Sequence, residues 1–176
     1  DNGANQSTFG GAITLGAAST VGGTGQLTIS SAITDGASSF GLTKSGTGTV
    51  ILATANTYDG GTTLSAGTLS LGNSTSLGTG SLALNSGTLQ ANTANINVAN
   101  AVALGANANV GGINNFTMSG VVSGANGLTK SGTSMVTLNN ANTYTGTTTI
   151  NAGTIRAQNA TALGTTAGGT IVGSAG

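Results

Sequence analysis

The chain has 176 residues, of which only three are acidic and three basic, and its net charge is zero. So few cations exclude a nucleic-acid surface and a surface for anionic membranes, because both need clustered lysine and arginine. Histidine and cysteine are absent and the acids are Asp1, Asp35 and Asp59, which excludes the usual nucleophile–base pairs and leaves few carboxylates for glycoside hydrolysis. We therefore expect no catalytic, cofactor-binding or metal-binding residues, no enzyme activity, and neither a nucleic-acid partner nor a small-molecule substrate.

Short stretches of apolar residues alternating with small polar ones recur along the chain, at 26–29, 68–71, 81–84, 136–138 and 154–157. This period of two predicts strands with one buried face. Between the stretches stand steps such as Gly22-Gly23 and Ala152-Gly153, which favour turns. Eight aliphatic side chains are expected to point inward: Leu42, Leu52, Leu69, Leu82, Leu84, Leu128, Leu138 and Ile155.

A long internal repeat organises the chain. Residues 41–47 recur letter for letter at 127–133, and positions 41–79 align with 127–165 without a gap, with 24 of 39 residues identical. Self-similarity at a fixed spacing is typical of arrays. We expect one continuous segment over 1–176, made of two copies at about 1–90 and 91–176. The second copy stops inside a motif, so the segment is expected to be part of a longer array.

The composition favours a parallel β-helix over disorder and over a β-sandwich. Disorder is disfavoured because 37% of the residues are hydrophobic and the net charge is zero. A sandwich core would need larger side chains than a chain with 3% aromatic residues offers. In a β-helix, stacked aliphatic residues fill a narrow interior and rungs stack at about 4.8 Å. Dividing the 86-residue offset by four predicts rungs of about 21 to 22 residues, and therefore an all-β, single-stranded parallel β-helix (β-solenoid) of about eight rungs.

Two motifs recur in both copies: Gly-Leu-Thr-Lys-Ser-Gly-Thr from residues 41 and 127, and Ala-Asn-Thr-Tyr from residues 55 and 141. Together with the residues that follow them, they resemble the passenger-associated transport repeat of bacterial autotransporters. The resemblance implies a right-handed parallel β-helix passenger that is exported through the outer membrane and exposed on or shed from the cell. It also implies an outer-membrane barrel in the full-length chain and a role of the repeats in efficient secretion.

Two pairs of repeated residues invite a binding role. Lys44 and Lys130 occupy one repeat position about four rungs apart, which is too far for them to share a ligand group. We expect each to be a solvated strand-end or turn residue, so that alanine at position 130 costs less than about 0.5 kcal/mol. Tyr58 and Tyr144 could stack on sugars at the surface, but packing over a coil corner is the favoured interpretation.

Two further patterns have simple explanations. Asp59-Gly60-Gly61 resembles the start of a calcium-binding turn, but its counterpart Thr145-Gly146-Thr147 has no acid, so we expect a plain turn. Sequons for N-glycosylation begin at four asparagines, and in a chain so rich in Asn, Ser and Thr glycosylation stays a minor alternative. They are Asn5, Asn73, Asn115 and Asn159.

Two functions from different classes fit this sequence. One is a non-catalytic structural stalk in a secreted or surface-exposed autotransporter-like adhesin, which aids secretion and display. The other is a subunit of a self-assembling extracellular fibre, in which β-helix ends stack on one another because little charge repels them. A third function, ice binding through Thr147-Thr148-Thr149, is disfavoured because the counterpart is Gly61-Thr62-Thr63 and the row is irregular.

Overall fold

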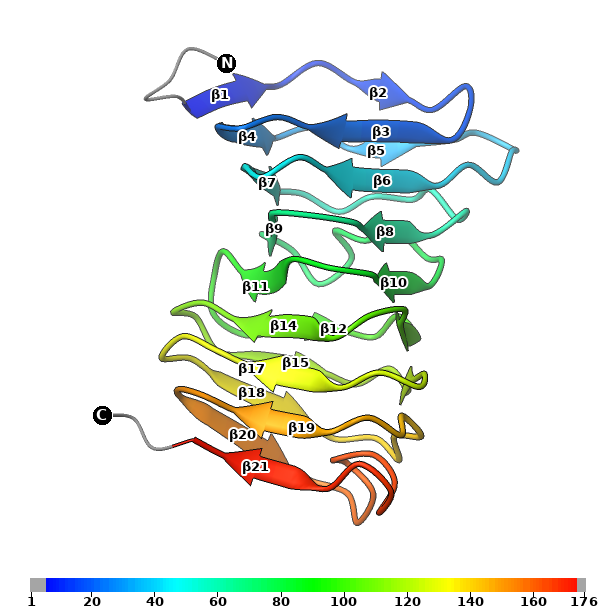
Figure 1. Cartoon of the computed structure of the whole chain (residues 1–176). Helices are drawn as coiled ribbons and strands as arrows, with labels where there is room; N and C mark the ends of the chain where they lie inside the picture. The colour runs from blue at the N-terminus through cyan, green and yellow to red at the C-terminus, as the bar shows by residue number, and fades with distance from the viewer. Residues whose placement is uncertain (1–5, 174–176) are drawn as a thin grey trace.

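Strands of successive coils stack in parallel along residues 6–173, the part of the chain that the computed structural model describes (Figure 1). Asp1, Asn5 and residues 174–176, where the second copy was expected to stop inside a motif, lie outside the described residues. All strand pairs in the described part are parallel. No helix among these residues is long and apolar enough to cross a membrane. The predicted all-β parallel β-solenoid of about eight turns is confirmed, and an antiparallel sandwich is excluded.

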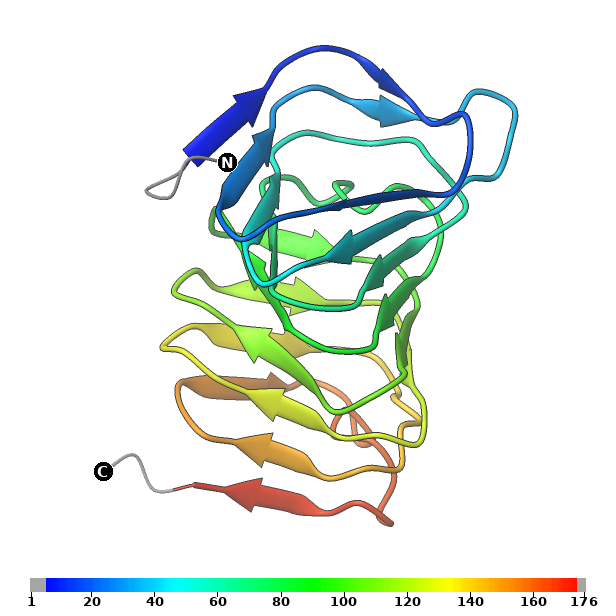
Figure 2. The same cartoon turned by 45° about the horizontal axis from the view of Figure 1, so that its top comes forward.

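Four parallel sheets make up the walls of the solenoid. The tilted view shows the chain winding through successive stacked coils (Figure 2). The long sheet contains β1 (Gln6–Phe9), β4 (Gln26–Ile29), β7 (Thr49–Leu52), β9 (Thr68–Leu71), β11 (Thr88–Ala91), β14 (Ala108–Gly111), β17 (Leu128–Lys130), β19 (Thr148–Ile150) and β21 (Thr170–Val172). The six-stranded sheet contains β3 (Ser19–Gly22), β6 (Leu42–Ser45), β8 (Thr62–Leu64), β10 (Leu82–Leu84), β13 (Val102–Leu104) and β16 (Val122–Ser123). The four-stranded sheet contains β12 (Ile96–Val98), β15 (Phe116–Met118), β18 (Met135–Leu138) and β20 (Thr154–Ala157), and the two-stranded sheet contains β2 (Ile13–Thr14) and β5 (Ile33–Thr34).

The four coils in the middle of the long sheet are slightly shorter than the sequence predicted. Along the long sheet, Thr49 pairs with Thr68, Thr68 with Thr88, Thr88 with Asn109, and Asn109 with Thr129. These four coils therefore span the 80 residues from 49 to 129, about 20 per coil, slightly below the expected 21 to 22. Other coils of the same sheet are longer, since Gln26 pairs with Thr49 and Thr148 with Thr170. The repeat spacing of 86 residues is longer than four coils by six residues, close to a third of a turn.

This mismatch moves the second copy around the solenoid axis. Strand β6 of the first copy lies in the six-stranded sheet, whereas its equivalent β17 lies in the long sheet. Strand β7 lies in the long sheet, whereas its equivalent β18 lies in the four-stranded sheet. The same local motif is therefore built into different walls, so its structure depends on contacts between adjacent coils and not on one particular wall.

The interior consists of columns of aliphatic side chains, one from each coil. In the long sheet, Val50, Leu69, Leu89 and Val110 follow one another in register and are at most 1% exposed. Seven of the eight residues predicted to point inward are buried, as period-two alternation requires; they are Leu42, Leu52, Leu69, Leu82, Leu84, Leu128 and Leu138. Ile155 packs against this core but is only partly buried, because β20 is the last strand of its sheet among residues 6–173.

Candidate functional site

The repeated lysines lie inside the solenoid, and the expectation that they are solvated was wrong. Lys44 is 1% exposed and Lys130 is 0% exposed. Each takes a place in an aliphatic column: Lys44 between Val21 and Leu64, and Lys130 between Val110 and Ile150. The alternation of β6 and β17 turns both side chains inward, so the aliphatic stem packs like leucine and only the ammonium needs polar partners.

Backbone carbonyls supply those partners. The Nζ of Lys44 donates to the oxygens of Ser45 at 2.7 Å, Gly46 at 2.8 Å and Ala66 at 3.0 Å. Two of these carbonyls belong to the corner that follows the lysine, and the third belongs to the corner of the next coil. Burial lowers the pKa of Lys44, yet three acceptors match the three N–H donors of an ammonium group.

Lys130 repeats this geometry in a different wall. Its Nζ donates to the oxygens of Ser131 at 2.6 Å, Gly132 at 2.8 Å and Ala152 at 3.2 Å, and burial lowers its pKa as well. The same three-carbonyl cradle in two independent copies indicates that the lysine is a structural part of the motif.

A buried asparagine in each copy joins three successive coils. The Oδ1 of Asn56 accepts from the backbone N–H of Ile33 in the preceding coil at 2.8 Å, and its Nδ2 donates to the oxygen of Ser76 in the following coil at 2.5 Å. Asn142 makes the equivalent bonds with Val122 at 2.8 Å and Ala162 at 2.7 Å. Each amide thus replaces strand hydrogen bonds in a stretch that forms no strand.

The repeated tyrosines are completely buried, each 0% exposed. The hydroxyl groups of Tyr58 and Thr62 lie 2.6 Å apart, and the Thr62 hydroxyl donates to the oxygen of Leu77 at 3.2 Å. The hydroxyl of Thr62 has one proton, which it gives to Leu77, so Tyr58 is the donor to Thr62. Tyr144 and Thr148 form the same pair at 2.6 Å. The tyrosines pack in the core, and neither presents its ring to a surface ligand.

We expect alkaline pH to destabilise the fold through these tyrosines. Burial raises the pKa of Tyr58 from 10.0 to about 12, although the bond with Thr62 lowers it slightly, and burial also raises the pKa of Tyr144. The pKa of this acid is higher in the folded state than in the unfolded state. The full stability is therefore present below about pH 10 and is lost as the pH rises from about 10 to about 12. For Tyr58 the loss is about 2 to 3 kcal/mol.

Denaturant unfolding of the chain between pH 10 and pH 12, with tyrosinate absorbance followed in parallel, measures this loss. The double variant Tyr58→Phe/Tyr144→Phe is the control and should lack most of the decline. Lys44 and Lys130 do not produce this decline. Their lowered pKa values make the stability rise with pH, and they do so only below the unfolded pKa of 10.5. An equal alkaline decline in the control would contradict the prediction.

Asp35 and Asp59 of the first copy meet at a corner. Asp35 is buried, and its Oδ2 accepts from the backbone N–H groups of Asp59 and Phe40, both at 3.1 Å. These bonds lower the pKa of Asp35, and the bond from Asp59 has the largest effect. In the second copy the N–H of Thr145 donates to the oxygen of Gly124 instead. The Asp35 carboxylate therefore takes the place of a backbone carbonyl that accepts the equivalent bond in the second copy. Its role is to support the corner.

Three sequons fall among the described residues. Asn73 and Asn159 lie exposed in equivalent turns, and their Oδ1 atoms accept from the backbone N–H of Thr75 at 2.9 Å and of Thr161 at 3.1 Å. The Oδ1 of Asn115 accepts from the N–H of Met135 at 2.6 Å. Each of these three asparagine oxygens thus has a local structural use.

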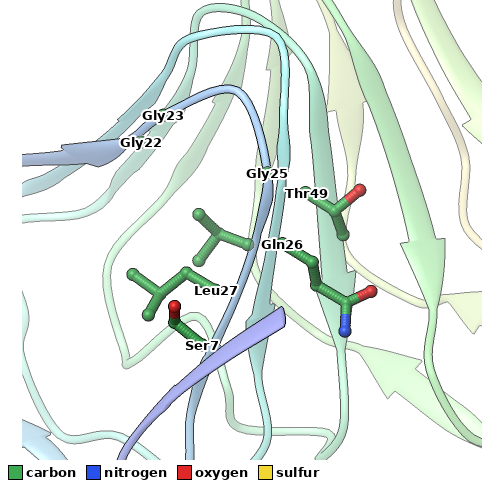
Figure 3. A pocket seen from close by; sticks show the side chains of 8 residues that line it. Ser7, Gly22, Gly23, Gly25, Gln26, Leu27 and Thr49 are labelled. Atoms are coloured by element: carbon green, nitrogen blue, oxygen red, sulfur yellow. The ribbon is translucent and has the colours of Figure 1, made fainter. Parts of the chain in front are cut away.

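A cavity of about 140 Å³ opens near the N-terminal coils, beside Ser7, Gln26 and Leu27 (Figure 3). Its remaining lining consists of Gly22, Gly23, Gly25, Thr49 and Val50. None of the eight lining residues is titratable, so the cavity offers neutral hydroxyl and amide groups and no acid, base or strong nucleophile.

The comparisons with known proteins agree with this architecture. The family model described as the passenger-associated transport repeat matches residues 42–71 and 128–157, the two segments that contain the buried lysine, asparagine and tyrosine. The Adhesin BmaC autotransporter of Brucella suis biovar 1 (strain 1330) is 36% identical over 153 residues, which covers 76% of this chain. The chain is an autotransporter passenger repeat region. No solved structure matches it.

As a passenger repeat region, the chain is exported through the bacterial outer membrane to the cell surface. It spans only 4% of the length of the Brucella adhesin.

Sequence reasoning missed three features of the passenger repeat. It gave no role to Asn56 and Asn142, and it placed Lys44 and Lys130 in solvent. A signal was present, because both residue types recur unchanged in copies that differ at 15 of 39 aligned positions. The third feature, the rotation of the second copy, depends on the coil length of about 20 residues, which the repeat spacing does not give.

Proposed function

We propose that this passenger repeat region is a non-catalytic stalk that aids secretion and holds an adhesive region of the full-length protein away from the cell. The observation that carries this proposal is the use of the repeated polar residues. Lys44, Asn56 and Tyr58, and their equivalents in the second copy, direct their polar groups to other coils or to the core. Side chains used in this way stabilise the shape and are not free for ligands or chemistry.

The solenoid geometry supports a mechanical role in display. About eight coils stacked at about 4.8 Å give a rod about 38 Å long. Bonds between coils join residues 19 to 25 positions apart, such as Leu42 with Gly61 and Gly48 with Gly23. Because no distant sequence is needed, an emerging chain can fold coil by coil. Folding outside the cell would oppose return through the pore. Within a longer passenger, the two copies would form one continuous part of the stalk.

Surface display tests the proposal. The segment is placed in the passenger of a reporter autotransporter, between an N-terminal epitope and the outer-membrane domain, and epitope exposure on intact cells is counted. We expect the folded segment to give more exposed epitope than a Gly/Ser linker of equal length. The double variant Leu52→Ala/Leu138→Ala, which has a weakened core, should give less. Equal exposure with all three inserts would refute a role of the folded segment in secretion and display.

A fibre subunit is the second candidate, and the low charge of the chain favours it. The chain has only three acidic and three basic residues, and its net charge is zero. Little electrostatic repulsion therefore opposes the stacking of one copy on another. Light scattering of the purified segment separates the candidates: concentration-dependent filaments would favour the fibre, and a stable monomeric rod would favour the stalk.

A further inference from the structure

The two buried lysines are unusual because the core would be simpler without them. The residues that share their columns are Val21 and Leu64 for Lys44, and Val110 and Ile150 for Lys130. A leucine or methionine would fill such a place without a charge, and replacing buried charges by apolar residues is often neutral or stabilising in proteins. The ammonium groups therefore need an explanation beyond filling space.

The positions of the carbonyl acceptors explain why a buried ammonium group is useful here. Two of the three carbonyls around each ammonium belong to the corner of the same coil, and the third belongs to the next coil: Ala66 for Lys44 and Ala152 for Lys130. A corner that has formed alone offers two acceptors, and the third arrives only when the next coil docks. The buried ammonium is fully paired only after docking.

Glycines give the cradle its shape. Gly67 and Gly153 follow the third acceptor in each copy and have φ angles of +68° and +69°, a region that side chains disfavour. A Cβ atom at Gly67 would stand 2.7 Å from the Nζ of Lys44, and one at Gly153 would stand 2.6 Å from that of Lys130. The next coil thus has both the backbone conformation and the empty space that the ammonium requires.

The third carbonyl acceptor reaches the ammonium group in only one strand register. A strand that slips by two residues keeps its apolar face inward, so the aliphatic columns discriminate weakly against such a slip. In a chain built from Thr, Gly, Ala and Leu steps, this error is accessible. A two-residue slip moves the backbone by about 7 Å, which takes the third carbonyl and the glycine gap away from the ammonium. The slipped state would then bury an incompletely paired charge, which is costly.

We propose that Lys44 and Lys130 are register locks between adjacent coils of the solenoid. Each lysine admits the next coil only in the register that brings Ala66 or Ala152 to its ammonium group. This inference rests on the proposed structural function and specifies how the repeat serves it. Every 86 residues, the repeat restores the register of coils whose aliphatic columns discriminate only weakly against a two-residue slip.

Cross-linking measures the register directly, because the chain has no cysteine of its own. Thr129 and Thr149 are paired on the outer face of β17 and β19, and adjacent parallel strands are close enough for a disulfide. The variant Thr129→Cys/Thr149→Cys therefore reports the native register. Thr129→Cys/Thr147→Cys and Thr129→Cys/Asn151→Cys report slips of two residues in either direction.

Each cysteine pair is placed in three backgrounds: Lys130, Lys130→Met and Leu138→Ala. The proteins are unfolded, refolded and then oxidised. We expect Lys130→Met to raise the yield of a slipped pair several-fold and to lower that of the native pair. Leu138→Ala weakens the core without touching the cradle and should leave the ratio unchanged. Equal ratios in all three backgrounds would overturn the proposal.

A chemical rescue keeps the proposal testable if Lys130→Met fails to fold. Lys130→Ala removes three carbons and the amine, which n-propylammonium can replace. We expect the added amine to restore the native cross-link ratio of Lys130→Ala and to slow its unfolding several-fold, with no such effect on Leu138→Ala. An amine effect of equal size in Leu138→Ala would overturn the cradle as its cause. These measurements use purified protein, so a failed surface-display test leaves them unaffected.

Discussion

Changing Leu138 to alanine lowers the free energy of unfolding by about 2 to 5 kcal/mol. Leu138 is 0% exposed and stands in the column between Met118 and Ala157 in the four-stranded sheet. Removing most of its side chain leaves a cavity that backbone bonds on both sides prevent from collapsing, so the lost contacts add to the lost transfer free energy. Leu52, its repeat equivalent between Ile29 and Leu71 in the long sheet, should show a cost in the same range.

Denaturant unfolding of the chain, with midpoint and slope both fitted, measures this cost. Thr129→Ala is the matched control, since Thr129 lies on the outer side of β17 and is only partly buried; its cost should be below about 0.5 kcal/mol. If Leu138→Ala costs less than about 1 kcal/mol while Thr129→Ala costs more, the inward and outward faces have been wrongly assigned.

The alternation of small and aliphatic residues was enough to predict which faces of the strands are buried. A period of two allows one face only, and leucines such as Leu82 and Leu84 satisfy it by lying two residues apart in one strand. The coil length could not be obtained in the same way. The repeat spacing equals the coil length times an unknown number, which need not be whole, and the second copy is rotated by the remainder.

The burial of Lys130 was missed for a different reason. A buried lysine is normally inferred from a nearby acid, and the sequence offers none beside it. Its partners are the carbonyls of Ser131, Gly132 and Ala152, and every residue has a carbonyl, so side-chain identity does not reveal them. The position of Lys130 did contain a clue, since the alternation that turns Leu128 inward turns residue 130 inward as well. Lysine side chains are usually exposed to solvent, and the prediction followed this general tendency instead of the local alternation.

The asparagine bridges should be nearly as important for stability as the leucine columns. Changing Asn142, which is 3% exposed, to alanine leaves the N–H of Val122 and the oxygen of Ala162 without their side-chain partner. An unpaired buried polar group costs about 1 to 3 kcal/mol, so two such groups give an expected loss of about 2 to 6 kcal/mol. Asn139→Ala, at an exposed position two residues before the Ala-Asn-Thr-Tyr motif, is the control and should cost below about 0.5 kcal/mol.

Asn142→Asp separates the two bonds of the bridge. The carboxylate keeps an acceptor for the N–H of Val122 but loses the donor to Ala162, and its charge is buried, which raises its pKa above the unfolded value of about 3.9. The folded state then holds its proton at higher pH than the unfolded state, so the variant is most stable at acid pH and loses stability as pH rises. Denaturant unfolding at several pH values measures this slope relative to the unchanged chain. A flat difference between the two chains across the acid range would mean that Asn142 fills space without bridging the coils.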